Sequence, residues 1–419
     1  MTESAPRVLV LAEKIKEQAT RLVATLESQN VASPSFSVDA LPKLPDSPEI
    51  GTSQTEILQC CTELQALVEG PLEFLTRVTS PRMNILVALQ AISHFKIATN
   101  LKVDEEISFE EIAQRCGMEV DDARRFLRMA TTNHIFIEGR KGFIKHTAAS
   151  RLLAENDLVN NWIGLVCDEM WPVGPKIVPA TIKWPGSQEP NETAFALENN
   201  GMIHWDALKQ DPSKALRFAA GMRFLQLHPA FDVSHLFTSL GWDKEYQGVL
   251  VDIGGSTGSI AREFLGRYPN LVCHVQDLPE MIGEGVVEDE FRGRLHFVPQ
   301  DIFTAQSVRA DVYLLRSLLH DWSDKYAIQI IRNLIPGLSK GSKVIVNEVC
   351  LPEPNTISFY HAQLLRGYDL SMKQNYNSKE RDAEEWEALF QLADKRFALN
   401  RIVSLPGSLL SVVEFLWTE

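Results

Sequence analysis

The sequence predicts an α/β protein in which a doubly wound, Rossmann-like parallel sheet follows a mainly helical N-terminal region. Three observations predict this fold class. From about residue 249 onward, short apolar strands alternate with helical segments, which is the order of βαβ units. Before that point, helical periodicity prevails. Within this helical part, residues 108–144 show the order helix, turn, helix and hairpin that is typical of a winged helix.

The composition fits a folded chain of two or three domains. Of the 419 residues, 45% are hydrophobic and 23% are charged, so the chain needs no disulfides to build a core. Asp and Glu outnumber Lys and Arg by 55 to 41. This acidic balance argues against nucleic acid or an anionic membrane as a partner, because both attract basic surfaces.

Cysteine usage and hydropathy indicate the compartment. The six cysteines are scattered, without a C-x-x-C pair or a zinc-like spacing, as expected in a reducing environment. The apolar run at residues 8–12 is too short and wrongly flanked for a signal peptide, and no stretch of 18 uncharged apolar residues occurs. We therefore expect a cytoplasmic protein without a membrane span.

The first elements along the chain are helices separated by a proline-rich arm. Apolar residues recur mostly every three to four positions over residues 7–29, which predicts a helix. Four prolines and many serines over residues 31–53 indicate a linker or mobile arm. Helical periodicity returns over residues 57–100, with breaks expected before Pro71 and Pro81.

The winged-helix pattern begins with a clear helix start. Ser108, with Glu111 three residues later, predicts a capping box that opens a helix over residues 109–115. Gly117 turns the chain into a second helix over residues 121–131, and a short hairpin follows. Three arginines on the second helix make DNA binding one interpretation. A structural or dimerisation role is the other, and the acidic chain favours it.

The remaining elements are helices and then a sheet. Residues 155–230 are expected to be mainly helical, with a proline-rich loop. Five parallel strands are expected at residues 249–253, 272–276, 295–298, 312–315 and 343–347. A last strand at residues 409–415 follows the turn at Pro406-Gly407, and we expect it to close one edge of the sheet antiparallel.

A glycine-rich turn follows the first strand of this sheet. Residues 249–253 end in Gly254-Gly255-Ser256-Thr257-Gly258, and Asp277 ends the next strand, where an acidic residue typically binds a ribose hydroxyl. This coincidence predicts a nucleotide-like ligand rather than only a tight turn. The G-x-G-x-x-G fingerprint and the Walker A lysine are both missing, which argues against a nicotinamide dehydrogenase. An adenosine without a pyrophosphate fits better, and S-adenosylmethionine is the common ligand of this kind.

Two titratable residues are expected to face the same crevice. His320 follows the fourth strand, and Glu348 follows the fifth. Ligands of doubly wound sheets bind beyond the carboxyl ends of the strands, so both side chains are expected near the ligand. A single histidine is more often structural, but this position favours a functional role.

The motifs together resemble those of plant and fungal small-molecule O-methyltransferases, such as the caffeate, flavonoid and sterigmatocystin-type enzymes. The resemblance covers nearly the whole chain from Ile57 onward. It rests on residues 252–258, 276–279, 301–303, 320–324 and 379–381. It implies S-adenosylmethionine as cofactor and a homodimer formed by the winged-helix region. After the N-terminal helix and Pro/Ser-rich arm (1–55), the domains it implies are a winged-helix dimerisation domain (56–154), a helical connecting and substrate-pocket region (155–235) and a cofactor-binding catalytic domain (236–419).

The resemblance also implies roles for individual residues. His320 would be the general base, and Glu348 and Glu380 would hydrogen-bond its imidazole and fix its orientation. The implied cofactor-binding residues are Gly254, Gly255, Gly258, Asp277, Leu278, Asp301, Ile302, Phe303 and Arg316. Arg316 stands where relatives often carry lysine, so a cationic group persists there. Ser256 replaces a more common glycine, and we expect this departure to be tolerated.

Elementary chemistry agrees with these roles. Methyl transfer from a sulfonium to a hydroxyl needs positioning and a base but no metal. Histidine suits the task, because its ordinary pKa is about 6.5 and that of a phenol is about 10. A flat, hydroxylated aromatic or polyketide-type acceptor is expected. The predicted substrate contacts are Met170, Met222, Trp322, Asp369 and Met372.

Two other functions remain open. Some fungal relatives keep S-adenosylmethionine but catalyse a dehydration or a pericyclic reaction without methyl transfer. The presence of His320, Glu348 and Glu380 together favours methylation. The second possibility is a ligand-sensing, DNA-binding regulator, for which the basic second helix of the winged-helix pattern is the only support.

Overall fold

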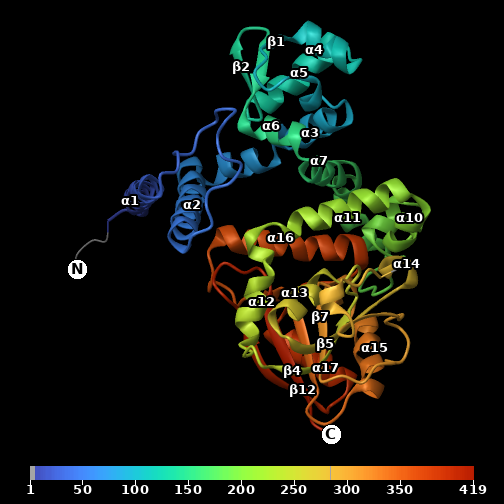
Figure 1. The fold of residues 1–419 in the computed structure, drawn as a ribbon. Coiled ribbons are helices and arrows are strands. Elements are labelled where there is room, and N and C mark those ends of the chain that lie inside the picture. Colours follow the sequence, from blue (N-terminus) through green and yellow to red (C-terminus); the bar gives the residue numbers. More distant parts are fainter. Residues whose placement is uncertain (1–4, 284) are drawn as a thin grey trace. The chain divides into compact units, whose positions relative to one another are not determined.

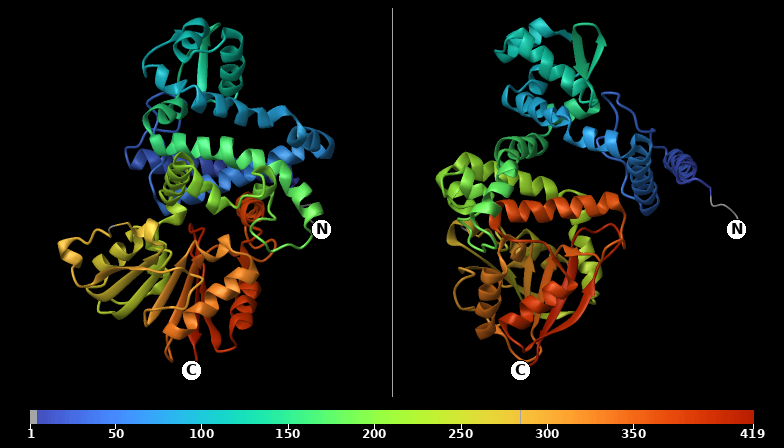
Figure 2. Two further views of the ribbon diagram at one scale, coloured as in Figure 1. Left: turned by 90° about the vertical axis from the view of Figure 1, so that its right-hand side faces the viewer. Right: turned by 180° about the vertical axis from the view of Figure 1, so that it is seen from behind.

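The computed structural model describes residues 5–283 and 285–419 (Figures 1 and 2). These residues fall into two compact units. The first unit holds the described residues up to Pro172, together with Leu208–Leu225 and Ser358–Tyr360. The second unit holds Val173–Ala207, the described part of residues 226–357, and His361–Glu419.

The first unit begins with two helices that pack on each other, α1 (Arg7–Ser28) and α2 (Pro48–Thr79). The expectation that the arm extends to residue 53 is wrong, because Ser47 caps α2: its hydroxyl accepts the N–H of Ile50. Proline suits the first position of the helix, since its missing N–H is not needed there. Gly70, at φ 69°, interrupts α2, and Ser80 ends it, so both predicted breaks are confirmed.

The arm between α1 and α2 contacts other parts of the first unit. The ring of Phe36 stacks on that of His134, with the ring centroids 3.9 Å apart. Arg151 forms an ion pair with Asp39 over 3.0 Å. The arm is therefore attached at two points of the first unit, and its mobility stays a prediction.

The winged helix forms as predicted. It consists of β1 (Ile107–Ser108), α4 (Phe109–Cys116), α5 (Val120–Thr131), β2 (Phe136–Arg140) and β3 (Phe143–His146). Its small sheet is antiparallel, in the order β1-β3-β2. The hydroxyl of Ser108 accepts the N–H of Glu111, and Gly117 turns the chain at φ 66°.

The arginines of α5 are matched by carboxylates of the same unit. Arg125 pairs with Asp121 over 2.7 Å, and Arg128 pairs with Glu138 over 2.8 Å. Arg124 lies 3.5 Å from Asp121. Their positive charge is thus largely balanced locally, which favours the structural interpretation of this helix.

Further helices complete both units. In the first unit these are α3 (Asn84–His94), α6 (Ala148–Glu155), α7 (Asp157–Gly164), the π-helix Leu165–Met170, and α11 (Pro212–Gln226) except for its last residue. α10 (His204–Gln210) runs from the second unit into the first. Those of the second unit are α8 (Ile177–Lys183), α9 (Ala194–Glu198), α12 (Val233–Leu240), α13 (Ser259–Arg267), α14 (Pro279–Ile282), α15 (Asp324–Leu334) and α17 (Ala383–Ala393). α16 (Phe359–Tyr376) also belongs to the second unit from His361 onward, and its first two residues belong to the first unit. The region over residues 155–230 is mainly helical, as predicted.

A seven-stranded sheet forms the centre of the second unit. Its strands are β4 (Gln247–Ile253), β5 (Asn270–Asp277), β6 (Leu295–Pro299), β7 (Val312–Arg316), β8 (Lys343–Glu348), β11 (Phe397–Val403) and β12 (Ser411–Trp417). The order is β11-β12-β8-β7-β4-β5-β6, and the five strands predicted from residue 249 to 347 are parallel. The last strand is antiparallel, as predicted, but it does not close the edge. The edge strand is β11, which the sequence analysis missed.

Helices cover both faces of the sheet (Figures 1 and 2), and each face buries alternate residues of the strands. On one face, Val251 and Leu315 pack with residues of α15 and α17. On the other face, Leu250 and Leu314 pack with residues of α12 and α13. Strands buried on both faces are nearly continuously apolar, which is why the sequence showed them so clearly.

None of the helices within the described residues combines the length and the apolar character that crossing a bilayer requires.

Candidate active site

The carboxyl ends of four neighbouring parallel strands define the candidate active site, which lies within the second unit. β5, β4, β7 and β8 lie side by side in this order. The chain leaves β4 for β5 on one side and later returns to β7 on the other side, so the strand order reverses at β4. Ligands of doubly wound sheets bind beyond the strand ends at such a point.

The glycine turn after β4 passes closely over a buried side chain. The N–H groups of Gly254 and Gly255 donate to the carbonyl of Gln276 on β5, over 2.7 and 3.2 Å. A Cβ atom at Gly255 would lie 2.6 Å from Asp252 Oδ2, so only glycine fits there. Gly258, at φ 77°, starts α13 from the left-handed region. The turn thus presents closely packed backbone at the end of the sheet.

Ser256 and Asp277 join the turn to the end of β5. Ser256 has φ 48°, where glycine is more usual, and its N–H donates to Asp277 Oδ2 over 2.9 Å. The N–H of Leu278 donates to Asp277 Oδ1 over 2.8 Å. These bonds fix the carboxylate, and each oxygen keeps acceptor capacity for a ligand hydroxyl. The turn therefore accommodates serine, as the sequence analysis expected.

Asp252 is buried and Arg316 is half-buried at the ends of β4 and β7. Asp252 is 2% exposed, and within the described residues its Oδ2 has no hydrogen-bond partner. Burial raises the pKa of Asp252 to about 7, against the opposing effect of the Arg316 charge. Arg316 donates to the carbonyl of Phe231 over 2.7 Å and to the side chain of Asn347. A contact between Arg316 and the cofactor stays a prediction.

The loop after β6 carries the residues predicted for the adenine side. Asp301 Oδ1 accepts the N–H of Phe303 over 2.9 Å, and Ile302 and Phe303 pack against the core. Gln306 ties this loop to β5, since its amide exchanges two 2.8 Å hydrogen bonds with Gln276. Because the carbonyl of Gln276 also receives the glycine turn, one residue anchors both segments.

His320 lies on a short 3₁₀ turn, Leu319–Asp321, that follows β7. Its Nδ1 is 3.0 Å from Glu380 Oε1, and Glu380 is buried. When the proton is on Nδ1, the ring donates to Glu380 and Nε2 keeps its lone pair. Glu380 therefore favours the tautomer that a general base requires.

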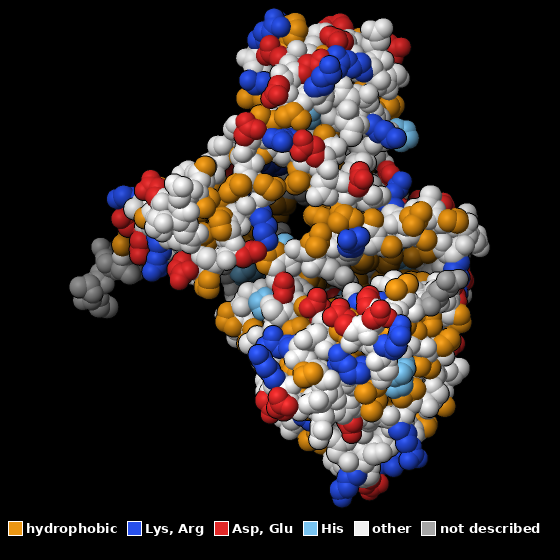
Figure 3. Space-filling view, in the orientation of Figure 1, with side chains coloured by type: hydrophobic (Ala, Val, Ile, Leu, Met, Phe, Trp, Pro, Cys, Tyr) orange, Lys and Arg blue, Asp and Glu red, His pale blue; other side chains and the backbone are white. Residues whose placement is uncertain are grey.

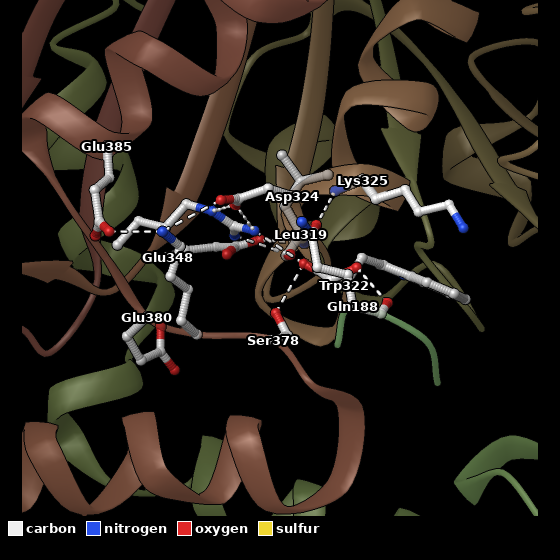
Figure 4. Close-up of polar contacts among 12 residues, drawn as sticks. Gln188, Leu319, Trp322, Asp324, Lys325, Glu348, Ser378, Glu380 and Glu385 are labelled. Carbon is white, nitrogen blue, oxygen red and sulfur yellow. Dashed lines mark hydrogen bonds and ion pairs between the residues drawn. The ribbon is translucent and has the colours of Figure 1, made fainter. Parts of the chain in front are cut away.

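Glu348, at the end of β8, holds the backbone of the His320 turn (Figure 4). Its Oε1 accepts the N–H groups of Leu318 and Leu319 over 2.8 and 2.6 Å. The hydrogen bond predicted between Glu348 and the imidazole is not among the described contacts. Glu348 instead acts on the ring through its charge.

Three carboxylates surround the imidazole. Asp321 Oδ1 is 3.7 Å from His320 Nε2. Burial alone would lower the pKa of His320, but the charges of Asp321, Glu380 and Glu348 outweigh it and raise this pKa to about 10. Burial also raises the pKa of Asp321, to about 7, and that of Glu348. The cluster therefore stabilises an imidazolium.

A small parallel ladder explains why residues distant in the sequence converge here. β9 (Cys350–Leu351) pairs with β10 (Arg381–Asp382), with Arg381 opposite Cys350. Glu348 lies just before β9, and Glu380 lies just before β10. The ladder thus brings the two carboxylates to the same place. The sequence motifs contain both glutamates but give no sign of this pairing.

The predicted substrate contacts are only partly brought together. Asp369 Oδ1 accepts the N–H of Glu380 over 3.0 Å, so it supports the residue that binds the imidazole. Trp322 packs edge-on against Phe303, with ring centroids 4.8 Å apart. The other three are Met372 on α16 and, in the first unit, Met170 and Met222. Contact with substrate stays a prediction for all five.

Arg381 and Asp321 are site residues that the sequence analysis quoted within motifs but gave no role. Arg381 donates to the carbonyls of Leu319 and Trp322, and Asp321 faces His320 Nε2. Their adjacency to Glu380 and His320 was the available signal. No three His, Cys, Asp or Glu side chains in the described ranges are arranged to hold a metal ion.

Comparison with known proteins identifies the family. A family model described as an O-methyltransferase domain matches residues 186–395. The O-methyltransferase kk1A of Curvularia clavata is 57% identical, over 98% of this chain and 97% of its own length. The chain belongs to this family of O-methyltransferases. Family membership also gives the chain its cofactor, S-adenosylmethionine, and its place in secondary metabolism.

Solved structures share the fold. A structure titled "The structure of LepI complex with SAM" has a TM-score of 0.72 and 20% identity, and covers 97% of this chain and 100% of its own. A structure titled "A Pericyclic Reaction enzyme" has a TM-score of 0.73, 20% identity and the same coverage. The chain's own residues fit an adenosyl cofactor, because the glycine turn admits no Cβ at Gly255 and Asp277 ends β5 with spare acceptor capacity.

Proposed function

We propose that His320 is the general base of the methyl transfer and that the acceptor is a hydroxyl of an aromatic or polyketide-type metabolite. The observation that carries this proposal is the 3.0 Å contact between His320 Nδ1 and Glu380 Oε1. It holds the ring in one tautomer, leaves Nε2 as the basic atom and provides a negative charge for the imidazolium that forms.

One set of residues binds the cofactor, and His320 transfers the proton. When bound, S-adenosylmethionine supplies a methyl group on a sulfonium, which is already activated for displacement. The glycine turn and Asp277 bind the amino-acid and ribose parts, and Leu278, Asp301, Ile302 and Phe303 border the adenine. Arg316 contributes positive charge at the same strand ends. His320 Nε2 takes the proton of the acceptor hydroxyl, so that the oxygen becomes nucleophilic.

Substitution of His320 tests this proposal. The acceptor is selected first, by turnover, from a panel of hydroxylated naphthalenes and anthraquinones. In His320→Ala we expect S-adenosylmethionine to bind normally by calorimetry, while S-adenosylhomocysteine release falls by about 10²- to 10⁴-fold, the usual contribution of a general base. His94→Ala, an exposed histidine on α3, is the matched control. Full turnover by His320→Ala would remove His320 from the mechanism.

Pericyclic or dehydration chemistry is the second candidate function. The structural similarity to a pericyclic reaction enzyme favours it, whereas the 57% identical relative is named as an O-methyltransferase. The two candidates give different products from the same incubation. An isomerised or dehydrated acceptor without any S-adenosylhomocysteine would overturn methyl transfer as the function.

We also propose that the first unit forms a homodimer, without nucleic acid as a partner. Leu72, Leu75 and Val78, spaced three residues apart on α2, are 75%, 59% and 50% exposed. Figure 3 shows hydrophobic side chains on the surface where α2 lies in Figure 1. Exposed apolar patches of this kind mark interaction sites. Sedimentation should give a dimer mass, and Leu72→Asp should shift it toward the monomer; a monomer in the unaltered protein would refute this.

A further inference from the structure

Arg381 is a fully buried guanidinium whose bonds all go to one short segment. Its relative exposure is 0%. Nε and Nη2 donate to Asp324 Oδ1 over 3.0 and 2.9 Å. Nη1 donates to the carbonyl of Leu319 over 3.1 Å, and Nη2 donates to that of Trp322 over 2.9 Å. Four of its five N–H groups therefore bind the segment from Leu319 to Asp324.

This segment is the turn that carries His320. The carbonyls that Arg381 binds lie on either side of His320 in the sequence, and Figure 4 shows Leu319, Trp322 and Asp324 within one network of polar contacts. Glu348 binds the N–H groups at the start of the same turn. Glu348 therefore accepts hydrogen bonds from the backbone N–H groups of the turn, and Arg381 donates hydrogen bonds to its backbone carbonyls.

Arg381 also shares a rigid element with the partner of the imidazole. It directly follows Glu380, and it is the first residue of β10, paired with Cys350 of β9. One short strand therefore delivers the carboxylate to His320 Nδ1 and the guanidinium to the backbone around His320. A shift of Arg381 relative to the turn would change the distance between ring and carboxylate.

We propose that Arg381 is a positioning residue that fixes the His320 turn relative to Glu380 and so sets the orientation of the base. The inference rests on the proposed role of His320. Only arginine has the geometry for this task, since its planar fork reaches two carbonyls and a carboxylate at once, whereas a lysine is a point charge. Misplacement of a catalytic group by about 1 Å costs on the order of 10²-fold in rate.

Arg381→Lys tests the geometry while keeping the charge. The variant is compared with the unaltered protein, both loaded with S-adenosylmethionine, at a temperature where both are folded. We expect kcat to fall by about 10- to 100-fold, with the Kd of S-adenosylmethionine and the KM of the selected acceptor within threefold of the unaltered values. The control Arg396→Lys changes a half-buried arginine paired with Asp394, and all three constants should stay the same.

A second readout separates positioning from a general structural role. The pKa of His320 is measured by NMR of ¹³C-labelled histidine rings, with the signal assigned by its loss in His320→Ala. We expect Arg381→Lys to lower this pKa by about half a unit or more, because the bond to Glu380 lengthens. An unchanged pKa together with kcat within threefold would overturn the inference. So would a joint loss of kcat and cofactor affinity with the pKa unchanged.

Asp324→Asn keeps the inference testable if Arg381→Lys does not fold. Asp324 is partly exposed, and its removal frees Arg381 from one partner while both carbonyls remain. We expect a kcat loss of about 3- to 10-fold and a pKa shift in the same direction. Unaltered values in this variant would contradict the inference. If Arg381→Lys is fully active while His320→Ala is inactive, only this inference fails; an active His320→Ala refutes the proposed base itself.

Discussion

Replacement of Glu380 by glutamine gives the sharpest test of the site's electrostatics. The carboxylate lies 3.0 Å from His320 Nδ1 and is almost fully buried. A hydrogen bond to a charged partner contributes about 1.5–3 kcal/mol, and one pKa unit corresponds to about 1.4 kcal/mol. Loss of the negative charge destabilises the imidazolium, so in Glu380→Gln the pKa of His320 should fall from about 10 by about 1–2 units.

The pH dependence of kcat then distinguishes the two proteins. The proposed base, His320, accepts a proton only when it is neutral, so kcat of the unaltered enzyme should rise about tenfold per pH unit below the pKa of His320. The variant should reach its plateau at lower pH, and that plateau should be about 10- to 100-fold lower, because the same 1.5–3 kcal/mol is missing for the imidazolium that forms. The kcat of the unaltered enzyme divided by that of Glu380→Gln should therefore increase between pH 7 and pH 10.

The assay measures S-adenosylhomocysteine release with saturating acceptor and cofactor across this pH range. Glu384→Gln, an exposed glutamate on α17, serves as the control and should behave as the unaltered enzyme. A kcat ratio that does not change with pH, or a midpoint that moves to higher pH in Glu380→Gln, would refute the electrostatic role assigned to this carboxylate.

Two further predictions concern the end of β4. Gly255→Ala should lower Tm and weaken S-adenosylmethionine binding at least tenfold in calorimetry, because its Cβ would lie 2.6 Å from Asp252 Oδ2; Gly266→Ala has open space around it and should keep both values. Asp252→Asn should raise the Tm of the cofactor-free protein more at pH 8.5 than at pH 5. Burial raises the pKa of this carboxyl to about 7 in the folded protein, so its ionisation destabilises the folded state. This destabilisation reaches its full size only above pH 7. An equal Tm change at both pH values would contradict this.

The sequence predicted the elements whose signals are local. Ser108 and Gly117 define the first helix of the winged helix by capping and by a left-handed turn, and the structure has both. The parallel strands were found because they are buried on both faces and therefore almost entirely apolar. β11 was missed because Asn400 and Arg401 interrupt its apolar pattern, and both bind Glu414 on the neighbouring strand. That partner is not visible in a local window of sequence.

The sequence predicted which residues form the candidate site but not which of them are hydrogen-bonded to each other. His320, Glu348 and Glu380 were singled out, yet the sequence does not show that Glu348 binds backbone N–H groups while Glu380 binds the ring. The hydrogen bonds of Arg381 to the His320 turn were missed for the same reason. Its partners lie 57–62 residues away in the chain, and only the folded sheet brings them together.

The short ladder of β9 and β10 has a consequence for how the enzyme folds during its synthesis. During synthesis, the histidine emerges from the ribosome well before the chain segment that will orient it. A growing or truncated chain that ends before residue 380 contains β4 to β8, yet it lacks Glu380, the partner of the imidazole, and the strands β11 and β12. Catalytic competence should therefore appear late, when the final tenth of the polypeptide adds β10 to β9, and β11 and β12 to the five parallel strands.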